Sequence, residues 1–461
     1  MSTRIVVIGG VAAGTKAAAT ARRRNSAAEV IVLQNEAEVS YSSCGLPYHL
    51  ADAQGIPRAR LIARTPEVFR ADGIDMRTRH RVEEIDAQQG LVTVRDLQQA
   101  RTYTQPYDKL LIATGAIASP LKARVGAAAP QVLHLRSIGD ADAIAQRLSG
   151  VRKVVILGGG YIGLEMAHTF KALGRDVTLI EAMPHVIPSY DAAIALIVEA
   201  TLREHGVELF TGVRVSELAD GGVILETGNR IVADLVLVAT GVRPATALAL
   251  AAGVKLGDTG AIAVSPQMAT NLPNVYAAGD CAESPHRVTN RPVWLPLGDV
   301  ANRHGRVAGI NMAGGNTEFA GVLGTGIFQV FDSAVARTGL GHVEALAAGF
   351  TPVSETLQAP SRARYMRGSK PLTMRVTADQ HTGRLLGCQV VGADAVDKTI
   401  DIAASALWGG LTVSDLADID LAYAPPFSPV LAPMQAAGEL LGKRLGENQR
   451  AAQAIHQPAQ T

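Results

Sequence analysis

Two segments of this 461-residue chain repeat one local pattern: an apolar run, a tight glycine turn and an alanine-rich helical stretch. The first occupies residues 5–21 and the second residues 154–173, so a whole domain's length of sequence separates them. A strand that turns through glycines into a helix is the unit with which dinucleotide-binding domains begin. The repetition therefore predicts two such α/β domains in one chain.

The second segment has the complete glycine pattern. Gly158, Gly160 and Gly163 stand at the three positions that allow the turn, the approach of backbone to a pyrophosphate and close helix packing. Glu181 ends the following strand, where an acid can accept from an adenosine 2′-hydroxyl and repel a 2′-phosphate. The pattern favours NADH and leaves NADPH open, and an ordinary structural turn is the alternative.

The first segment is less regular. Gly9 and Gly14 flank the turn, but Val11 stands where the middle glycine is expected. The next strand ends at Gln34, whose amide can still accept from a ribose hydroxyl, and Glu36 is a possible substitute. Taken alone, this segment is equally consistent with a structural turn between a strand and a helix.

Three short strand-to-turn segments accompany the two units. Two apolar strands break at Thr-Gly, in residues 110–115 and 235–241, and a third, residues 274–282, ends at Gly279 and Asp280. An Asp at such a strand end can accept from a flavin ribityl hydroxyl, while a following helix N-terminus faces the pyrophosphate.

In this order the segments resemble the two-dinucleotide flavoprotein disulfide reductases, and the resemblance covers residues 3–445. It implies an α/β fold with two Rossmann-like dinucleotide-binding domains, for FAD and NADH, and an α+β C-terminal dimerisation domain. The implied FAD domain comprises residues 1–118 and 245–325, the NAD(P)H domain 119–244 and the dimerisation domain 326–448. Residues 449–461, rich in Gln, Ala and Pro, are expected to form a disordered tail.

Cys44 lies in residues 40–48 without a neighbouring cysteine, since the others are Cys281 and Cys388. A redox thiol without a protein partner must cycle through a sulfenic acid, a persulfide or a mixed disulfide with a small thiol. The segment resembles the single-cysteine branch of the family, which contains coenzyme A disulfide reductases, NADH oxidases and NADH peroxidases. A helix that begins just after Cys44 would lower its pKa, and a structural apolar cysteine is the alternative.

The resemblance also bears on the substrate. Oxidase and peroxidase members carry a His where Ala12 stands, so Ala12 favours the coenzyme A disulfide and persulfide reductases. Tyr423 and Tyr365 match positions that reach across a homodimer to the substrate sulfur, where a phenol can hydrogen-bond or protonate a thiolate. Packing at the interface is the alternative for both.

Coenzyme A carries three phosphate groups and calls for Arg and small hydrogen-bonding side chains near the cysteine. By resemblance the substrate candidates are Arg23, Ser40, Ser43, Asn302 and Arg306. Arg70 and Asp72 do not clearly supply a basic residue that relatives have nearby, and Asp299 and Ala432 are further departures. These departures leave coenzyme A itself open and the disulfide or persulfide chemistry intact.

The cofactor residues implied by the two units and the resemblance fall into two sets. Tyr161 matches a movable gate over the flavin and Glu165 its neighbour beside the nicotinamide, although helix packing explains them nearly as well. The set expected at FAD is Gly9, Ala12, Gly14, Gln34, Ala113, Thr114, Gly115, Gly279 and Asp280. The set expected at NADH is Gly158, Gly160, Tyr161, Ile162, Gly163, Glu165, Glu181 and Gly241.

Composition narrows the remaining classes. A net charge of +1 and no basic run beyond residues 22–24 argue against nucleic acid or an anionic membrane as partner. Three scattered cysteines suit a reducing compartment and form neither a disulfide framework nor a metal site. Without a leader or a long apolar run, a cytoplasmic protein is expected, and an end at residue 461 leaves no room for a rhodanese domain.

We therefore expect a homodimeric FAD enzyme that uses NADH to reduce a low-molecular-weight disulfide or persulfide through Cys44. One alternative is an NADH oxidase or peroxidase that cycles Cys44 through a sulfenic acid. The other is a flavoprotein electron carrier with a protein partner.

Overall fold

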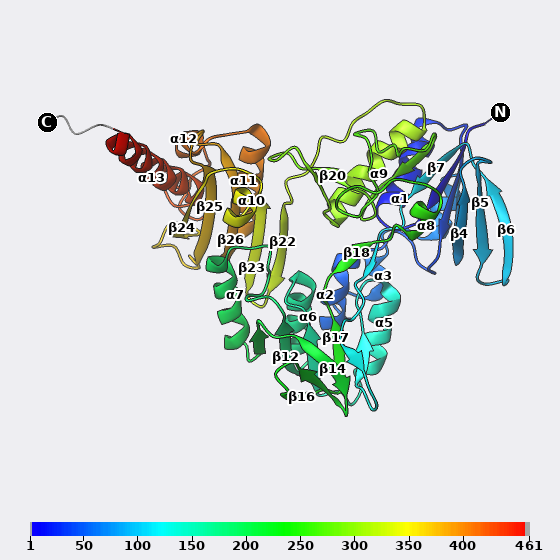
Figure 1. Cartoon of the computed structure of the whole chain (residues 1–461), viewed down its shortest axis with the longest axis horizontal. Coiled ribbons are helices and arrows are strands. Elements are labelled where there is room, and N and C mark those ends of the chain that lie inside the picture. The colour runs from blue at the N-terminus through cyan, green and yellow to red at the C-terminus, as the bar shows by residue number, and fades with distance from the viewer. Residues whose placement is uncertain (1, 457–461) are drawn as a thin grey trace.

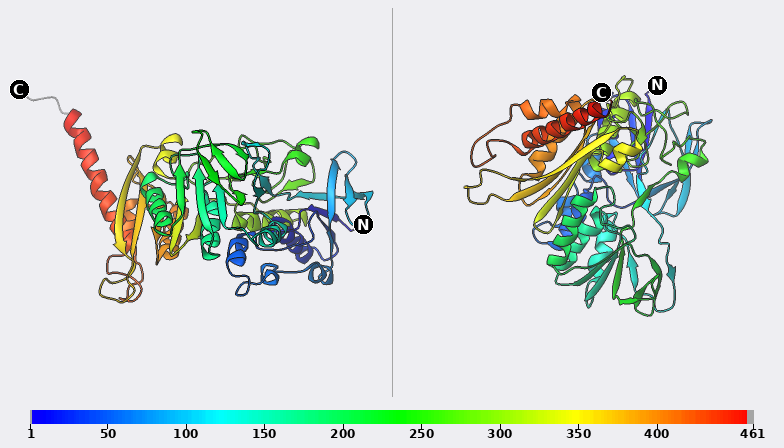
Figure 2. Two further views of the ribbon diagram at one scale, coloured as in Figure 1. Left: turned by 90° about the horizontal axis from the view of Figure 1, so that it is seen from below. Right: turned by 60° about the vertical axis from the view of Figure 1, so that its left-hand side comes forward.

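The computed structural model describes residues 2–456, with side chains to residue 448. Figure 1 shows three domains: a first α/β domain with the N-terminus, a second α/β domain, and a C-terminal domain built on a sheet. Helix α13 (Pro433–His456) projects from the C-terminal domain at the end of the molecule away from the N-terminus, as the left view of Figure 2 also shows.

The first α/β domain contains a parallel five-stranded sheet. In sheet order its strands are β19 (Val275–Ala277), β7 (Lys109–Ile112), β1 (Arg4–Ile8), β2 (Glu29–Gln34) and β3 (Ile74–Thr78). The central strands are apolar and buried along nearly their whole length, as in parallel sheets that helices cover on both faces. Because β19 comes from far downstream, the domain is assembled from two separate stretches of the chain.

Helix α1 (Ala13–Arg24) packs closely against α9 (Gly298–Met312). A Cβ at Gly305 of α9 would stand 2.2 Å from the Ala13 carbonyl oxygen, and one at Gly309 would stand 2.5 Å from that of Ala17. The alanines of the first segment are therefore small residues that allow α1 and α9 to pack closely.

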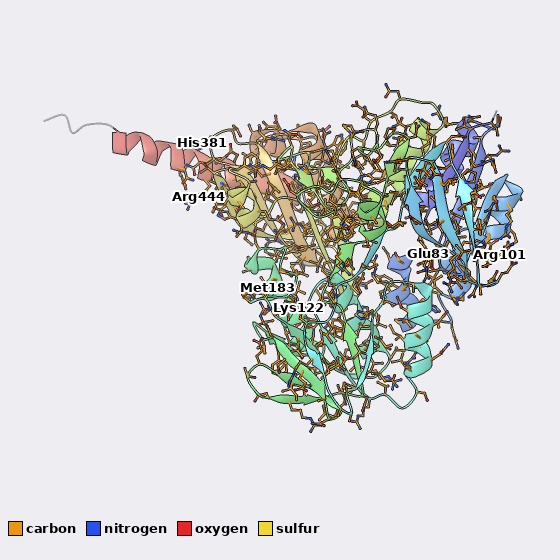
Figure 3. All side chains as sticks on the ribbon, turned by 45° about the vertical axis from the view of Figure 1, so that its right-hand side comes forward. Glu83, Arg101, Lys122, Met183, His381 and Arg444 are labelled. Atoms are coloured by element: carbon orange, nitrogen blue, oxygen red, sulfur yellow. The ribbon has the colours of Figure 1, made fainter. Side chains whose placement is uncertain are left out.

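The first domain is completed by short elements and a ribbon. The ribbon is a small antiparallel sheet of β4 (His80–Asp86), β5 (Leu91–Asp96) and β6 (Arg101–Pro106). Figure 3 labels Glu83 of β4 and Arg101 of β6, which lie at the opposite end of the molecule from Arg444 on α13. The short elements are η1 (Ser43–Gly45), α2 (Leu46–Ala51), α3 (Arg58–Leu61), α4 (Pro66–Ala71), α8 (Ala247–Ala251), β20 (Ser284–Pro285) and β21 (Pro292–Val293).

The second α/β domain repeats the order of four strands of the first, but its edge strand β10 precedes the other four in the chain, whereas β19 follows them. Its parallel sheet runs β10 (Gln131–Leu133), β17 (Leu235–Val238), β11 (Lys153–Leu157), β12 (Asp176–Glu181) and β13 (Glu208–Thr211). Its helices are α5 (Ile138–Arg147), α6 (Tyr161–Ala172) and α7 (Ala192–Glu204), and a further sheet contains β16 (Arg230–Val232), β15 (Gly222–Leu225), β14 (Val215–Ala219) and β9 (Arg124–Val125). Strands β8 (Ala116–Ala118) and β18 (Val242–Pro244) pair where the chain passes between the two domains.

The C-terminal domain has an antiparallel sheet in the order β22 (Gly326–Val330), β23 (Ser333–Gly339), β26 (Leu385–Gly392), β25 (Pro371–Asp379) and β24 (Pro352–Pro360). Its helices besides α13 are α10 (His342–Ala347), α11 (Val396–Gly409) and α12 (Val413–Asp418). The predicted fold class, two Rossmann-like domains followed by an α+β domain, is confirmed.

The end of the chain differs from the predicted disordered tail. Helix α13 continues through residues 449–456, and residues 457–461 lie outside the described residues. The Ala, Gln and Arg residues of this stretch favour a helix, and they extend one that the C-terminal domain has already begun. Within residues 2–456, no helix combines the length and apolar character needed to cross a bilayer.

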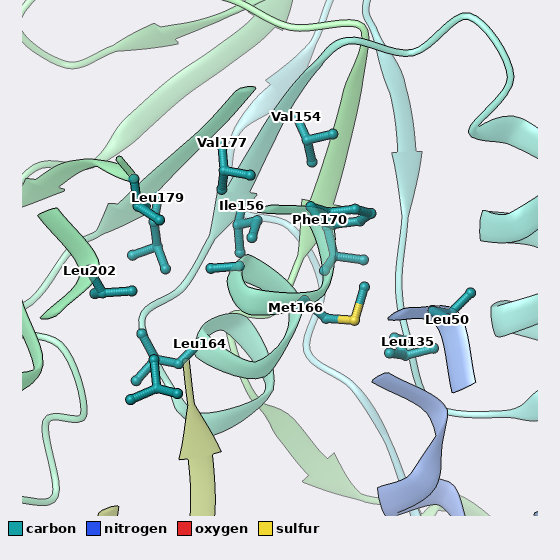
Figure 4. Close-up of a cluster of buried hydrophobic side chains, with 14 of the residues drawn as sticks. Leu50, Leu135, Val154, Ile156, Leu164, Met166, Phe170, Val177, Leu179 and Leu202 are labelled. Carbon is teal, nitrogen blue, oxygen red and sulfur yellow. The ribbon is translucent and has the colours of Figure 1, made fainter. Parts of the chain in front are cut away.

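The two α/β domains meet through α2 and α6. Figure 4 shows Leu50 of α2 and Leu135 beside Met166 of α6, within one buried apolar cluster. The buried Thr169 hydroxyl of α6 also donates to the Pro47 carbonyl oxygen at 3.0 Å. This contact fixes the segment around Cys44 against the first helix of the second dinucleotide unit.

Candidate functional site

The two glycine turns have nearly the same geometry. Gly9 follows β1 and Gly158 follows β11, with φ of +108° and +107°, in the region that glycine adopts readily. A Cβ at Gly9 would stand 2.1 Å from the Ala113 carbonyl oxygen, and one at Gly158 would stand 2.4 Å from the Ala239 carbonyl oxygen. Both turns therefore require glycine for backbone conformation and for the approach of the neighbouring strand.

The last glycine of each pattern allows helix and turn to pack. A Cβ at Gly14 would stand 1.8 Å from the Gly9 carbonyl oxygen, and one at Gly163 would stand 2.0 Å from the Gly158 carbonyl oxygen. Ala12 immediately precedes α1, and Ile162 lies in the first turn of α6. The irregular first segment thus folds as the regular second one does.

Gln34 and Glu181 occupy equivalent positions at the ends of β2 and β12, and both are buried. Gln34 Oε1 accepts from the Gly10 N–H at 2.8 Å, and Glu181 Oε2 accepts from the Gly159 N–H at 2.6 Å. Glu181 Oε1 also accepts from the Met183 N–H at 2.7 Å. The two dinucleotide units therefore differ at this position by one negative charge.

Open space lies beside the glycine turn of the first domain, and Arg136 of the second domain brings an unpaired donor near Asp280. Gly115 follows Thr114 at φ +72°, and a Cβ there would meet no atom within 4 Å. Asp280, after Gly279, lies 3.8 Å from Arg136 Nη2, and burial raises the pKa of its carboxyl group. Arg136 Nε is buried and has no hydrogen-bond partner among the described residues. These groups fit the hydroxyls and phosphate oxygens of FAD.

The second domain has a similar opening. Gly160 begins α6 and Gly241 follows β17, and a Cβ at either would meet no atom within 4 Å. The side chain of Tyr161 is 43% exposed beside this opening, with its ring centroid 6.5 Å from that of Phe328. A phosphate group can therefore approach the start of α6.

Cys44 lies in η1, which leads directly into α2. The segment is tied to the first glycine turn because the Ser40 N–H donates to the Gly10 carbonyl oxygen at 2.8 Å. Cys44 is exposed and free, whereas Cys281 and Cys388 are free and buried. Among residues 2–456, no second thiol is therefore exposed to resolve a bond formed at Cys44.

The expected low pKa of Cys44 is wrong for this structure. Loss of water around the thiol, and then the Glu165 carboxylate, raise the pKa of Cys44, while the Ser43 hydroxyl and Arg136 act in the opposite direction. The helix that was expected to favour the thiolate begins as a three-residue 3₁₀ turn and continues for six residues. Such short elements carry a small dipole, which local charges and desolvation outweigh.

Glu165 pairs with a residue that the sequence did not indicate. The Tyr48 hydroxyl of α2 donates to Glu165 Oε1 of α6 at 3.0 Å, across the domain contact and 117 positions along the chain. Burial raises the pKa of Glu165 to about 7, although the hydrogen bond from Tyr48 lowers it. Burial and Glu165 also raise the pKa of Tyr48. Near neutral pH this pair holds a proton beside Cys44.

Replacement of Glu165 by Gln should make Cys44 more reactive above neutral pH. Because the pKa of Glu165 is about 7, its carboxylate is largely neutral at about pH 6 and largely charged at about pH 8, where it opposes the thiolate. We expect iodoacetamide to alkylate Cys44 in Glu165→Gln on the order of threefold faster at about pH 8, with little change at about pH 6. Mass spectrometry measures the alkylation rates, and Glu67→Gln, at an exposed position on α4, is the control. If Glu165→Gln and wild type react at the same rate at both pH values, the assignment is contradicted.

The five predicted substrate residues fall into two groups. Ser43 hydrogen-bonds Cys44, and Ser40, four residues before the thiol, has φ +49° and donates its N–H to the Gly10 carbonyl oxygen. Arg23 is exposed on α1, and Asn302 with Arg306 is exposed one turn apart on α9, the helix packed against α1. The structure thus places the second group on neighbouring helices of the first domain.

Tyr365 and Tyr423 lie in the C-terminal domain and are 77% and 49% exposed. Within the described residues, neither hydroxyl has a hydrogen-bond partner. Phe427 and Val430, which follow Tyr423, are also highly exposed. A large apolar surface of this kind is characteristic of a protein interface.

No metal centre accompanies these residues. Within the described part of the chain, no three His, Cys, Asp or Glu side chains are grouped so as to hold a metal ion.

Comparison with protein families gives matches to two models that together span most of the chain. Residues 3–293 match the model described as pyridine nucleotide-disulphide oxidoreductase. Residues 327–434 match the model of the dimerisation domain of pyridine nucleotide-disulphide oxidoreductases.

Individual proteins are similar over nearly the whole length. The NAD(P)H coenzyme A polysulfide/persulfide reductase of Pyrococcus horikoshii is 38% identical over 447 residues, 94% of this chain and 97% of that protein. The NADH oxidase of Methanocaldococcus jannaschii is 33% identical over 453 residues, 96% of this chain and 99% of that protein. The solved structure of an NAD-dependent persulfide reductase from A. fulgidus has a TM-score of 0.92 at 37% identity, covering 96% of this chain and 84% of that one.

Proposed function

Because the chain belongs to the pyridine nucleotide-disulphide oxidoreductases, as the sequence predicts, we propose that it uses NADH and FAD to reduce a small disulfide or persulfide at Cys44. The substrate we propose is a disulfide or persulfide of coenzyme A or a similar thiol. The observation that carries the proposal is the position of Cys44, an exposed and unpartnered thiol held between two dinucleotide units.

The cofactor assignments follow from the two equivalent units. We propose that the first glycine turn, Gln34, Arg136 and Asp280 bind FAD, and that the second glycine turn with Glu181 binds NADH. FAD held by these residues would supply an acceptor for the hydride of a nicotinamide and a two-electron donor for a sulfur. The chain itself then has to bind both nucleotides, hold the sulfur in place and supply a proton.

For a disulfide RS–SR, the Cys44 thiolate attacks one sulfur, so that a Cys44–S–SR bond forms and RS⁻ leaves. Two electrons from NADH then break this bond, which returns the Cys44 thiolate and releases a second RS⁻. The hydride-derived proton and one proton from solvent convert both products to RSH. Glu165, with its pKa raised to about 7 by burial, and Tyr48 can hold one of these protons beside the thiol.

A second copy of the chain would complete the site. We propose a homodimer in which Tyr365 and Tyr423 of one subunit reach the sulfur held at Cys44 of the other, and in which Arg23, Ser40, Ser43, Asn302 and Arg306 bind the substrate. The matched dimerisation domain and the exposed tyrosines support this arrangement. Free cysteines and a thiol substrate also suit a cytoplasmic enzyme.

An NADH oxidase is the second candidate, because one relative of 33% identity has that name. In an oxidase of this kind, the Cys44 thiol would take one oxygen atom from hydrogen peroxide and release water, and two electrons from NADH with two protons would return the resulting sulfenic acid to the thiol and a second water. Ala12 leaves the first glycine turn without the histidine that the sequence comparison associates with that chemistry. The observation therefore favours the thiol substrate.

Steady-state NADH consumption separates the candidates. We expect the purified enzyme to consume NADH without oxygen when coenzyme A disulfide or coenzyme A persulfide is added, at least about tenfold faster than with oxygen alone. With coenzyme A disulfide as substrate, two molecules of RSH should form for each NADH consumed. A chromogenic reagent for thiols measures the RSH. A faster reaction with oxygen or peroxide would support the oxidase, and no turnover with any of these would point to a protein acceptor.

A further inference from the structure

The chain after Glu181 passes from the second α/β domain to the C-terminal domain before it enters α7. We propose that Asp191 and Arg375 form a positioning pair, through which the C-terminal domain holds this segment, residues 182–191, in the shape that binds the adenosine half of NADH. The inference rests on the proposed function of the second domain as the NADH site. Neither residue is assigned a role by the sequence.

Asp191 directs its carboxylate away from its own helix. It stands at the N-cap of α7, where Asp commonly accepts from the first backbone N–H groups of a helix, yet its side chain makes no such bond. Instead Asp191 Oδ2 accepts from Arg375 Nε of β25 at 2.8 Å, and Asp191 Oδ1 accepts from the His342 N–H at 3.2 Å. The Asp191 N–H donates to Gln389 Oε1 of β26 at 2.9 Å. The carboxylate and the backbone N–H of Asp191 therefore both bind the C-terminal domain, while its carbonyl oxygen accepts from the N–H groups of Ile194 and Ala195 in α7.

The ion pair is shielded from solvent. The side chains of Arg375 and Asp191 are 21% and 11% exposed, so the pair is screened less by salt than a surface pair. Arg375 also donates from Nη1 to the Thr356 hydroxyl of β24 at 2.9 Å, which fixes the guanidinium within its own sheet. Arg375 is thus a rigid anchor on the C-terminal domain.

A second arginine holds the residues just before Asp191. Arg337 of β23 donates to the Ser189 carbonyl oxygen and to Glu344, and its guanidinium carbon lies 5.6 Å from the centre of the Tyr190 ring. The attachment therefore covers three consecutive residues, from Ser189 to Asp191. Two strands of the C-terminal sheet, β23 and β25, supply the arginines.

The held segment is strained where it touches the glycine turn. Ile187 has φ +45°, a conformation that is costly for a β-branched residue and persists only when surrounding contacts enforce it. Its N–H donates to the Gly159 carbonyl oxygen at 2.8 Å, and its carbonyl oxygen accepts from the Tyr190 N–H at 2.8 Å. Gly159 is also the residue whose N–H binds Glu181. The strained residue thus joins the arginine-held end to the proposed ribose-binding carboxylate.

The same attachment reaches the proposed gate. The Tyr190 ring meets Phe328 of β22 edge-on, with centroids 6.4 Å apart, and Phe328 lies 6.5 Å from Tyr161. Tyr190 is therefore placed by Arg337 on one side and contacts the neighbour of Tyr161 on the other. Both ends of a bound NADH molecule would be adjacent to residues that the C-terminal domain positions.

If the pair were only a contact between domains, its loss would lower the stability of the protein without changing its affinity for nucleotide. The test therefore measures nucleotide affinity. The probe is ADP-ribose, which has the adenosine, ribose and pyrophosphate of NADH but cannot donate hydride. Titration calorimetry on the purified FAD-loaded enzyme measures its affinity for wild type, Arg375→Ala, Arg375→Lys and Asp191→Ala. Arg152→Ala is the matched control, because the Arg152–Asp176 ion pair lies in the same domain with side chains 81% and 58% exposed.

We expect Arg375→Ala and Asp191→Ala to bind ADP-ribose about tenfold more weakly, Arg375→Lys to lose about threefold, and Arg152→Ala to stay within about twofold. The double variant Arg375→Ala/Asp191→Ala should lose no more than either single variant, since both changes break one pair. Wild-type affinity in Arg375→Ala overturns the proposal, and should that variant fail to fold, wild-type affinity in Arg375→Lys does so. Wild type that binds ADP-ribose but turns over no thiol substrate would refute the proposed function and leave the positioning pair standing.

Discussion

Replacement of Cys44 by Ser should remove disulfide-dependent turnover while leaving nucleotide binding in place. A serine hydroxyl does not ionise near neutral pH and cannot form the bond to sulfur that the proposed reaction requires. We expect the rate of NADH consumption with coenzyme A disulfide to fall by roughly 10³-fold or more. The flavin absorbance should still bleach when NADH is added without oxygen, because Cys44 takes no part in that step.

The matched control is Cys388→Ala. Cys388 is also a free cysteine, but it is buried in β26 of the C-terminal domain. The turnover rate of the Cys388→Ala variant should stay within about twofold of wild type, although the small cavity left in the core will lower the stability of the variant. If Cys44→Ser keeps a tenth or more of the wild-type rate, a single reactive thiol cannot explain the activity.

The local parts of this fold were predictable because each depends on neighbouring residues. A glycine is needed wherever φ is positive and the next strand passes within about 2 Å of a would-be Cβ, and that requirement leaves a fixed spacing in the sequence. The irregular first unit shows the same principle, since Gln34 performs the hydrogen bond of Glu181 without its charge. The sequence indicates this equivalence of position, but the hydrogen bond from the Gly10 N–H is visible only in the structure.

The contacts between domains could not be predicted in this way. Tyr48 and Glu165 are 117 positions apart, and nothing around either residue indicates that α2 and α6 will meet. The contact of Arg136 with Asp280 could not be predicted either, because only folding brings these two residues together. The pKa of Cys44 was misjudged for this reason: the following helix is visible in the sequence, whereas the desolvation and the carboxylate that outweigh it arise from tertiary structure.

Glu181 should control the choice between NADH and NADPH. Its carboxylate is buried and held by the N–H groups of Gly159 and Met183, so it cannot move away from an added phosphate group. In Glu181→Ala we expect kcat/KM with NADH to fall by about tenfold. The ratio of kcat/KM with NADH to kcat/KM with NADPH should fall by on the order of 100-fold. Initial rates with saturating disulfide and varied nucleotide give both values.

Glu181→Gln separates the charge of this residue from its hydrogen bonds. Gln34 shows that a glutamine at the equivalent position of this fold accepts from the glycine-turn N–H at 2.8 Å. The amide oxygen of Glu181→Gln can still accept from the Gly159 N–H, but the amide NH2 cannot accept from the Met183 N–H as Glu181 Oε1 does, so we expect the variant to keep only part of its activity with NADH. It should also gain activity with NADPH, because the repulsion of a 2′-phosphate is gone. If instead Glu181→Gln rejects NADPH as strongly as wild type, the preference comes from the shape of the pocket, and residues 182–191 become the place to look for it.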